Sequence, residues 1–286
     1  MWLTLMLTIS SLVSRLLARH WPEPRSSRPT MPAAQDLPAA ATDTTAVDTI
    51  VRLPPLRLDR SRQAAPQVAD ALREAIVAVD IVPGTVLSRT DLAEHYGVSQ
   101  TPIRDALIRL GDEGLVDIYP QHATLVSRID ITSAQQAHFL RRALELEIVR
   151  KLAGLGVGVG EAAAAEALLK RLRAALRRQQ AALEPHDLHE FAEADRSFHR
   201  ELYVAADLAP LWDLVRSRSG HIDRLRSLHL PAQGKAEAVL RDHEAIVAAL
   251  EAQSPAQAEA ALREHLSGTL SFIDEICARY PDYVRR

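Results

Sequence analysis

The chain has 286 residues, of which 47% are hydrophobic and only 4% aromatic. A chain of this length holds about two domains, and its low aromatic content and 11 glycines favour a mainly helical protein over an all-β one. The net charge of −3 gives no sign of nucleic-acid binding by the chain as a whole, so a basic surface must be sought locally. The single cysteine, Cys277, excludes an internal disulfide, and we expect a cytoplasmic protein.

The first 60 residues lack the pattern of a folded domain. An apolar stretch over residues 1–14 is shorter than the roughly 20 residues that span a bilayer, and its arginines follow it, whereas those of a signal peptide precede it. Residues 21–55 are rich in Pro, Ala, Ser, Thr and Asp and have no apolar period. We therefore expect no membrane partner and a disordered extension over residues 1–60, within which Met31 offers an alternative start of translation.

Three helices are predicted next, within residues 61–128. The first is indicated by apolar residues at steps of three and four, namely Val68, Leu72, Ile76 and Val79. Ser88 can cap a second, short helix that ends at Gly97. Ser99 can cap a third, whose first turn holds Pro102, where no intrahelical hydrogen bond is lost.

The third helix combines a buried stripe with a polar outer face. The stripe consists of Ile103, Ala106, Leu107 and Leu110, and Gly114 can close the helix. Residues 115–119 and 124–127 then predict a small hairpin, which completes a winged helix-turn-helix. Short polar residues and Arg104 at the helix start suit the DNA major groove, although a lone arginine is more often simply solvated.

The whole segment resembles the DNA-binding domain of the GntR family of bacterial transcription regulators. The matching residues are Pro83-Gly84, Leu87, Leu92-Ala93, Gly97-Val98-Ser99, Thr101-Pro102, Arg104, Ala106-Leu107, Leu110 and Gly114-Leu115. The resemblance implies that Thr101 and Arg104 contact DNA, that Ser99 lies near the backbone, and that the wing at Gln121-His122 approaches the minor groove.

Three positions depart from the family pattern. Gln100 stands where relatives usually carry Arg, Arg89-Thr90 replaces a common acidic-basic pair, and Ala123 occupies the usual wing glycine. Because Gln can still read adenine, we expect an altered operator preference. The candidate DNA-contacting residues are Arg89, Ser99, Gln100, Thr101, Arg104 and His122.

The charge of this segment bears on its oligomeric state. Residues 60–128 contain seven arginines and nine acidic residues, a net charge of −2. Affinity for phosphates is then modest, and a monomer should bind double-stranded DNA poorly. We expect a homodimer that binds a palindromic operator.

The remaining chain reads as an all-α bundle, with short breakers between its helices. Six helical stretches are predicted, at residues 132–154, 160–184, 187–206, 208–229, 235–252 and 255–279. We expect residues 132–280 to form one effector-binding and dimerisation domain.

One acid and three histidines in this bundle predict a metal site. Asp195 and His199 are four residues apart, on one helix face, although such a pair is more often a surface hydrogen bond. His243 and His265 each lie among apolar residues that should face the bundle core. Three imidazoles and a carboxylate between helices would hold a divalent metal, with Zn, Ni and Mn all plausible.

This arrangement resembles the FCD effector domain that follows GntR-type DNA-binding domains, and six helices favour its shorter, VanR-like form over the FadR-like one. The resemblance implies that Asp195, His199, His243 and His265 bind the metal and that Arg141 can clamp a ligand carboxylate. The alternative for Arg141 is a helix salt bridge with Glu145. Four other histidines, expected on polar faces, are alternative ligands: His186, His189, His221 and His229.

These features lead to one main hypothesis and two alternatives. The main one is a regulator, not an enzyme, in which a small carboxylate at the metal changes DNA binding through the segment Ser127–Ser133. A metal-dependent hydrolase would need a general base beside the metal, and no HExxH-type motif supplies it. A helical module that binds other proteins is the second alternative.

Overall fold

The computed structural model describes residues 53–154, 161–268 and 270–286. The predicted disordered extension over residues 1–60 therefore falls mostly outside the described residues. Within its last part, Leu53, Leu56 and Leu58 pack against the core of the first domain. None of the described helices is both long and apolar enough to cross a membrane.

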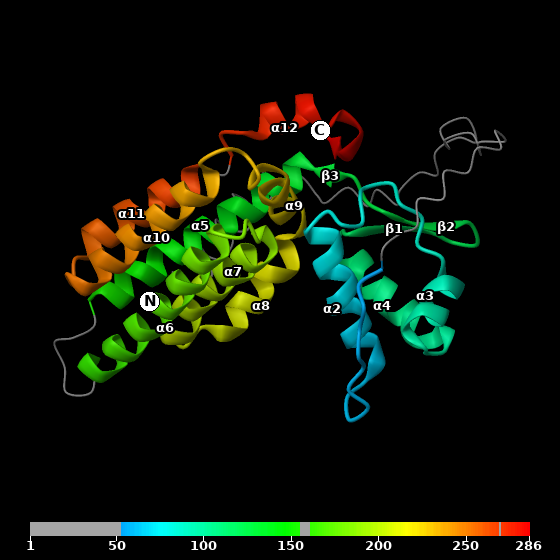
Figure 1. Ribbon diagram of the computed structural model, residues 1–286, viewed down its shortest axis with the longest axis horizontal. Coiled ribbons are helices and arrows are strands. Elements are labelled where there is room, and N and C mark those ends of the chain that lie inside the picture. Colours follow the sequence, from blue (N-terminus) through cyan, green and yellow to red (C-terminus); the bar gives the residue numbers. More distant parts are fainter. Residues whose placement is uncertain (1–52, 155–160, 269) are drawn as a thin grey trace, which may run out of the picture. The chain divides into compact units, whose positions relative to one another are not determined.

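The first domain is the predicted winged helix-turn-helix (Figure 1). Its elements are α2 (Ala64–Val77), α3 (Arg89–Tyr96), α4 (Gln100–Asp112), β1 (Val116–Tyr119) and β2 (Ala123–Val126). The two strands are antiparallel and pair Val116 with Val126 and Tyr119 with Ala123. The apolar stripes of α2 and α4 meet in a core where Leu72, Ile103 and Leu110 are fully buried. The predicted helix periods are therefore correct except at Val79, which lies beyond the end of α2 with a φ of 65°.

Capping residues set the ends of α3 and α4. The Ser88 hydroxyl accepts a hydrogen bond from Asp91 N at 3.3 Å, which starts α3. Gly97 ends that helix in the left-handed conformation, with φ of 63°. Ser99 occupies the N-cap position of α4 with extended backbone, and Pro102 lies in the first turn.

Gly114 has two roles where α4 leads into β1. Its φ of 73° lies in the left-handed region that glycine adopts without strain. A Cβ at this position would lie 3.2 Å from Nε2 of His221, which belongs to a helix of the second domain. The predicted helix-closing glycine thus also permits close approach of another element.

The second domain is the predicted helical bundle. Its helices are α5 (Ile131–Ala153), α6 (Glu161–Leu183), α7 (Leu188–Ala205), α8 (Ala209–Arg218), α9 (Gly220–His229), α10 (Lys235–Glu251), α11 (Pro255–Ser267) and α12 (Ile273–Arg279). Figure 1 shows α5, α6, α7, α10 and α11 running alongside one another. Their shared core includes Val149, Phe198 and Leu262, all fully buried.

Two of the six predicted helical stretches are each divided in two. The stretch 208–229 breaks at Ser219, whose hydroxyl donates to the Val215 carbonyl at 2.8 Å. Gly220 follows, and a Cβ there would come within 2.6 Å of the Leu115 side chain, so the break lets α9 approach the first domain. The stretch 255–279 is interrupted between α11 and α12, after Gly268 at the C-cap of α11.

The segment between the domains is held by the carboxyl end of the chain. β3 (Ile129–Asp130) pairs in parallel with β4 (Val284–Arg285), which follows the 3-10 helix η1 (Pro281–Tyr283). Asp130 also caps α5, because its carboxylate accepts a hydrogen bond from Ser133 N at 2.7 Å. The interdomain segment therefore contacts both α5 and the last residues of the chain.

Candidate metal centre and nucleic-acid interface

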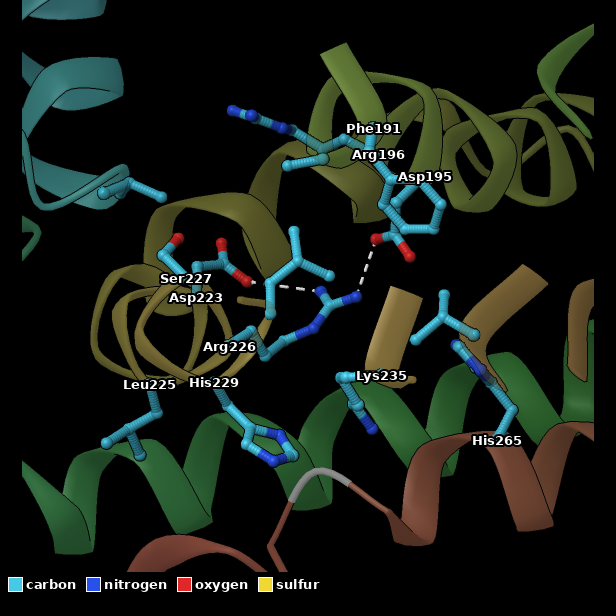
Figure 2. Close-up of a pocket in the computed structure, with 14 residues that line it drawn as sticks. Phe191, Asp195, Arg196, Asp223, Leu225, Arg226, Ser227, His229, Lys235 and His265 are labelled. Carbon is cyan, nitrogen blue, oxygen red and sulfur yellow. Dashed lines mark hydrogen bonds and ion pairs between the residues drawn. The ribbon is translucent and has the colours of Figure 1, made fainter. Parts of the chain in front are cut away.

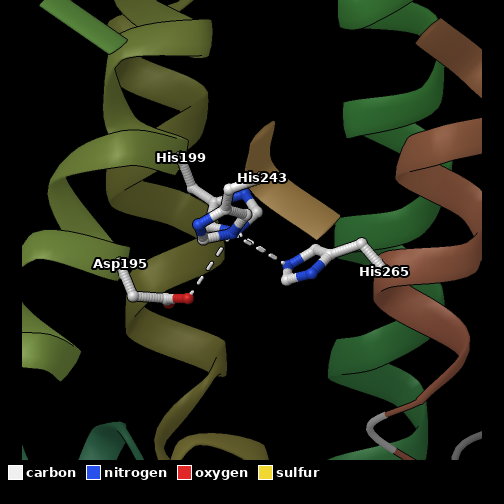
Figure 3. Close-up of side chains that lie close together, drawn as sticks. All are labelled: Asp195, His199, His243 and His265. Atoms are coloured by element: carbon white, nitrogen blue, oxygen red, sulfur yellow. Dashed lines mark hydrogen bonds and ion pairs between the residues drawn. The ribbon is translucent and has the colours of Figure 1, made fainter. Parts of the chain in front are cut away.

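Four side chains from three helices converge in the bundle core, as Figure 3 shows. Asp195 and His199 come from adjacent turns of α7, His243 from α10 and His265 from α11. One potential ligand atom from each lies within 4.8 Å of the others. All four residues are buried, and His199 and His243 are 0% exposed. The structure thus brings together the set that the sequence predicted.

Buried partners orient two of the imidazoles. Nδ1 of His199 lies 2.9 Å from the Glu145 carboxylate, and Nδ1 of His243 lies 2.9 Å from Oε1 of Gln179. Because each partner oxygen accepts a hydrogen bond, each Nδ1 carries the proton and each Nε2 keeps its lone pair.

The Nε2 atoms of the three imidazoles face one another. Nε2 of His265 lies 3.2 Å from Nε2 of His199 and 3.3 Å from Nε2 of His243. Each of these contacts can share at most one proton. Nitrogen lone pairs therefore lie close together in the buried core, away from water. A cation among them would relieve that repulsion.

Asp195 completes the donor set with one oxygen. Its Oδ2 accepts a hydrogen bond from Nη2 of Arg226 at 2.6 Å. Its Oδ1 is buried without a hydrogen-bond partner and lies 3.6 Å from Nε2 of His243. An unpartnered buried carboxylate oxygen beside three imidazole nitrogens fits a divalent transition metal.

The protonation states also suit metal binding. Burial, together with the charge of Arg141, lowers the pKa of His199 to about 4. Burial and the neighbouring His265 hold the pKa of His243 well below its usual value. Burial alone would raise the pKa of Asp195, but Arg226 and the two imidazoles bring it well below the usual range. The imidazoles of His199 and His243 are therefore neutral and Asp195 is ionised at neutral pH, as metal binding requires.

Arg141 forms the ion pair that was its alternative prediction. Its Nε lies 2.8 Å from Oε1 of Glu145, and both side chains are buried. Burial would raise the pKa of Glu145, yet Arg141 and His199 bring it to about 2. Arg141 thus holds the carboxylate that orients His199, while a direct contact with a ligand stays a prediction.

The other four histidines lie outside this cluster. His186 and His189 are exposed, as expected of polar-face residues. His221 and His229 are instead buried, and the expectation was wrong for them. His221 packs against Gly114, and His229 stacks on Phe272 with ring centroids 3.6 Å apart. Both gain partners that sequence spacing does not reveal.

A cavity of about 80 Å³ adjoins the cluster (Figure 2). Asp195 and His265 belong to both. Its other polar lining includes Arg226, Lys235 and His229, from α9 and α10. The apolar lining consists of Val77, Phe191, Ala192, Leu225, Leu230 and Val239. A small molecule in this space would reach the metal ligands, and the sequence analysis identified neither Arg226 nor Lys235.

The candidate DNA-contacting residues share one exposed face of the first domain. All six are exposed: Arg89, Ser99, Gln100, Thr101, Arg104 and His122. Four of them line one hollow between the starts of α3 and α4 and the wing, namely Arg89, Gln100, Arg104 and His122. The Arg104 side chain is 63% exposed, and its nearest acid is Asp105 at 3.5 Å.

Three exposed apolar residues line the same hollow and were missed by the sequence analysis. Val86 is 59% exposed, Ile108 46% and Ile118 44%. Such side chains contact thymine methyl groups in the major groove of DNA. Ile108 lies on the outer face of α4, where the sequence pattern predicted only polar residues.

Comparison with known proteins identifies the family. The model of bacterial regulatory proteins of the gntR family matches residues 64–126, and that of the FCD domain matches residues 136–268. An uncharacterized HTH-type transcriptional regulator in an unstable DNA locus of Streptomyces ambofaciens is 34% identical, over 74% of this chain and 85% of that protein. The chain belongs to the GntR family.

Other relatives of this GntR regulator are consistent with its assignment to the family. The HTH-type transcriptional repressor RspR of Escherichia coli (strain K12) is 29% identical, over 79% of this chain and 96% of that protein. The solved structure of Escherichia coli McbR/YncC shares the fold, with a TM-score of 0.62 and 22% identity over 78% of this chain and 99% of that one. The chain is a DNA-binding transcription regulator and not an enzyme, which confirms that prediction and excludes the hydrolase.

Proposed function

We propose that this GntR regulator is a homodimer that binds a palindromic operator and senses a small carboxylate at a divalent-metal centre in its bundle. The observation that carries the proposal is the convergence of three Nε2 atoms and one orphan carboxylate oxygen beside a cavity. Its place of action is the cytoplasm, where bacterial DNA lies.

The DNA-binding part of the proposal depends on the exposed face of α4. Arg104 and Gln100 carry groups that read guanine and adenine edges, while Ser99 and Thr101 suit phosphate contacts near the helix start. Arg89 and His122 border the same hollow from α3 and the wing. With a net charge of −2 over residues 60–128, one copy has little general attraction to DNA, which favours a dimer.

The sensing part depends on the open side of the metal centre. Asp195, His199, His243 and His265 would hold the ion, and a bound divalent ion supplies positive charge and further coordination positions for a carboxylate. Glu145 and Gln179 keep two of the imidazoles aimed inward before anything binds. Zn, Ni and Mn all suit this donor set.

Helix α9 offers a route from the centre to the DNA-binding domain. Arg226 of α9 binds Asp195. Arg224 of the same helix is fully buried, and its guanidinium donates a hydrogen bond to the Ser127 carbonyl at 2.6 Å. His221 accepts a hydrogen bond from Asp130 N at 3.0 Å. The helix therefore links the metal cluster to both ends of the Ser127–Asp130 segment.

This link gives the effector a physical means of action. A carboxylate in the cavity competes with Asp195 for Arg226, and any shift of α9 moves the residues that hold Ser127. The effector changes DNA affinity only by the difference in its affinity for the two arrangements.

The test compares His199→Ala with His189→Ala, an exposed histidine on the same helix. DNA from upstream of the regulator's own gene is titrated by fluorescence anisotropy at two salt concentrations, and zinc, nickel and manganese binding are measured by calorimetry. We expect His199→Ala to lose metal affinity by at least about a hundredfold while its DNA affinity stays within about twofold of the wild type. His189→Ala should match the wild type in both.

Two outcomes would contradict the proposal. Equal loss of metal and DNA binding in His199→Ala would assign the histidines to folding instead of sensing. DNA binding that is absent, or insensitive to salt, in the wild type would favour the helical module that binds other proteins.

A further inference from the structure

The cavity beside the four-residue His/Asp cluster is lined by more cationic than anionic side chains. Three cations line it, namely Arg196, Arg226 and Lys235, together with two carboxylates, Asp195 and Asp223. Arg196 pairs outside the cavity with Glu193 at 2.6 Å. Arg226 binds Asp195 at 2.6 Å and lies 3.6 Å from Asp223.

Lys235 differs from the two arginines because no carboxylate of the described residues lies at ion-pair distance from it, although Asp242 and Asp195 act on it from farther away. Among the described residues, no carboxylate forms an ion pair with its Nζ, which lies 5.3 Å from the Phe272 ring centroid. The side chain is half-buried between His229 and His265 (Figure 2). Burial and the charge of Arg226 lower the pKa of its ammonium group. An unpaired cation in a partly dry cavity is costly unless a ligand supplies the counter-charge.

The charges around the cavity cancel before a metal is counted. Arg196, Arg226 and Lys235 balance Glu193, Asp195 and Asp223. The buried pair of Arg141 and Glu145 is neutral as a unit, and Asp242 lies behind His265 with its side chain 36% exposed to solvent. A divalent ion at the cluster therefore leaves the cavity with an excess of one positive charge when Asp242 is counted, because Asp242 acts on Lys235, and of two when it is not. A ligand with one carboxylate, once that group is bound at the metal, would leave Lys235 without a counter-charge at ion-pair distance.

The cavity dimensions restrict the ligand further. A volume of about 80 Å³ suits a molecule of a few heavy atoms, well below the roughly 300 Å³ of a typical drug-sized pocket. The metal ligands Asp195 and His265 and the ammonium-bearing Lys235 line the same space. A short chain with an acid group at each end would meet both.

We infer that the effector is a small dianion, whose first acid group binds at the metal and whose second is bound by Lys235. This inference rests on the proposed metal-dependent sensing and adds the class of ligand and the residue that selects it. Arg226, released from Asp195 by the first acid group, is the second cation near the ligand.

The test uses lactate and malate, which carry the same 2-hydroxy acid group but differ by one carboxylate. Both are titrated into zinc-loaded full-length protein by calorimetry, and the zinc content is measured afterwards to exclude extraction by the acids. We expect the wild type to bind malate about tenfold or more tightly than lactate. Lys235→Met should bind lactate as the wild type does and lose the preference, while Lys235→Arg should keep it.

A matched control comes from Lys170→Met, which removes the same charge from an exposed position on α6. It should bind both acids as the wild type does. Equal affinity of the wild type for the two acids would overturn the dianion inference and leave the proposed function standing. Equal loss of both acids in Lys235→Met would make Lys235 a structural residue and also overturn it. Binding of neither acid to the zinc-loaded wild type would instead contradict the proposed function itself.

Discussion

The candidate metal site and the candidate DNA-contacting face differ in how their polar groups are treated. The cluster buries polar atoms that must be paired, and residues far apart in sequence, Glu145 and Gln179, orient its imidazoles. The candidate DNA-contacting face leaves its side chains exposed, and the starts of α3 and α4 and one hairpin position them. A substitution in the cluster therefore disturbs its neighbours, whereas one on the face removes a single contact.

The largest effect is expected on the exposed face, at Arg104. Removing its guanidinium by Arg104→Ala should weaken operator binding by about 1–3 kcal/mol per half-site, and so by about twice that in the proposed dimer. Fluorescence anisotropy with operator and unrelated DNA measures both affinity and specificity. Arg109→Ala is the control, since Arg109 is exposed near the other end of α4. Operator affinity unchanged in Arg104→Ala would reject base recognition by this residue.

A residue behind the metal ligands should have the next largest effect. Glu145→Gln leaves an acceptor for His199 Nδ1 but removes the charge that neutralises buried Arg141. We expect metal affinity to fall about 10- to 100-fold, measured by competition with a chelating dye. Glu147→Gln, at an exposed position on the same helix, should leave it unchanged. Equal metal affinities in the two variants would mean that Glu145 does not orient the site.

Two neighbouring glycines, Gly111 and Gly114, test how far an added Cβ is tolerated in an ordinary helical backbone and in a left-handed one. Gly114→Ala places a Cβ at φ 73° and 3.2 Å from Nε2 of His221, and should lower the free energy of unfolding by about 1–3 kcal/mol. At Gly111, inside α4, the nearest atom to the Cβ is the movable end of Ile118 at 3.3 Å, and the Val116 carbonyl lies at an ordinary contact distance of 3.9 Å. Gly111→Ala should be neutral or stabilising by up to about 1 kcal/mol. Denaturant titration measures both, and equal losses would contradict this account of Gly114.

The smallest effect concerns pH and His221. Burial, the neighbouring charge of Arg224 and that of Arg285 lower the pKa of His221 to about 4. The carboxylate of Asp130 opposes this shift only in part. In the unfolded chain this histidine binds its proton near pH 6.5, so the folded state loses stability as the pH falls from about 6.5 to about 4.

His221→Asn keeps an acceptor for Asp130 N but removes this titration. Between pH 7 and pH 5 the wild type should lose about 1–2 kcal/mol more stability than the variant. Thermal melts at both pH values measure the difference, and parallel pH profiles would show that His221 has the same pKa in the folded protein as in the unfolded chain.

The sequence predicted the fold because its local signals are strong. Ser88 sets a helix start through its hydroxyl, and Gly97 and Gly114 set helix ends through their left-handed backbone, all by short-range effects. The break at Ser219 was missed because it depends on the approach of Leu115, about a hundred residues earlier in the chain. Short-range patterns therefore predict where helices form but not where packing divides them.

The candidate site was predictable only in part, for a related reason. Asp195 and His199 share a helix face, and His243 and His265 interrupt apolar runs, which are patterns visible in the chain. Arg226 and Lys235 resemble any other solvated cations until α9 and α10 bring them to one cavity. The charge balance of a cavity depends on which helices pack together, so no pattern along the sequence predicts it.

The parallel pairing of β3 with β4 has a practical consequence for experiments. Arg285 contacts Asp130 at 3.1 Å, and Asp130 in turn starts α5 and binds His221. An affinity tag or fluorescent protein fused after Arg286 would begin beside the segment that joins the two domains. Assays of ligand response are better designed with the fusion at the other terminus, and a cut that removes residues 281–286 would be a direct way to loosen that linker.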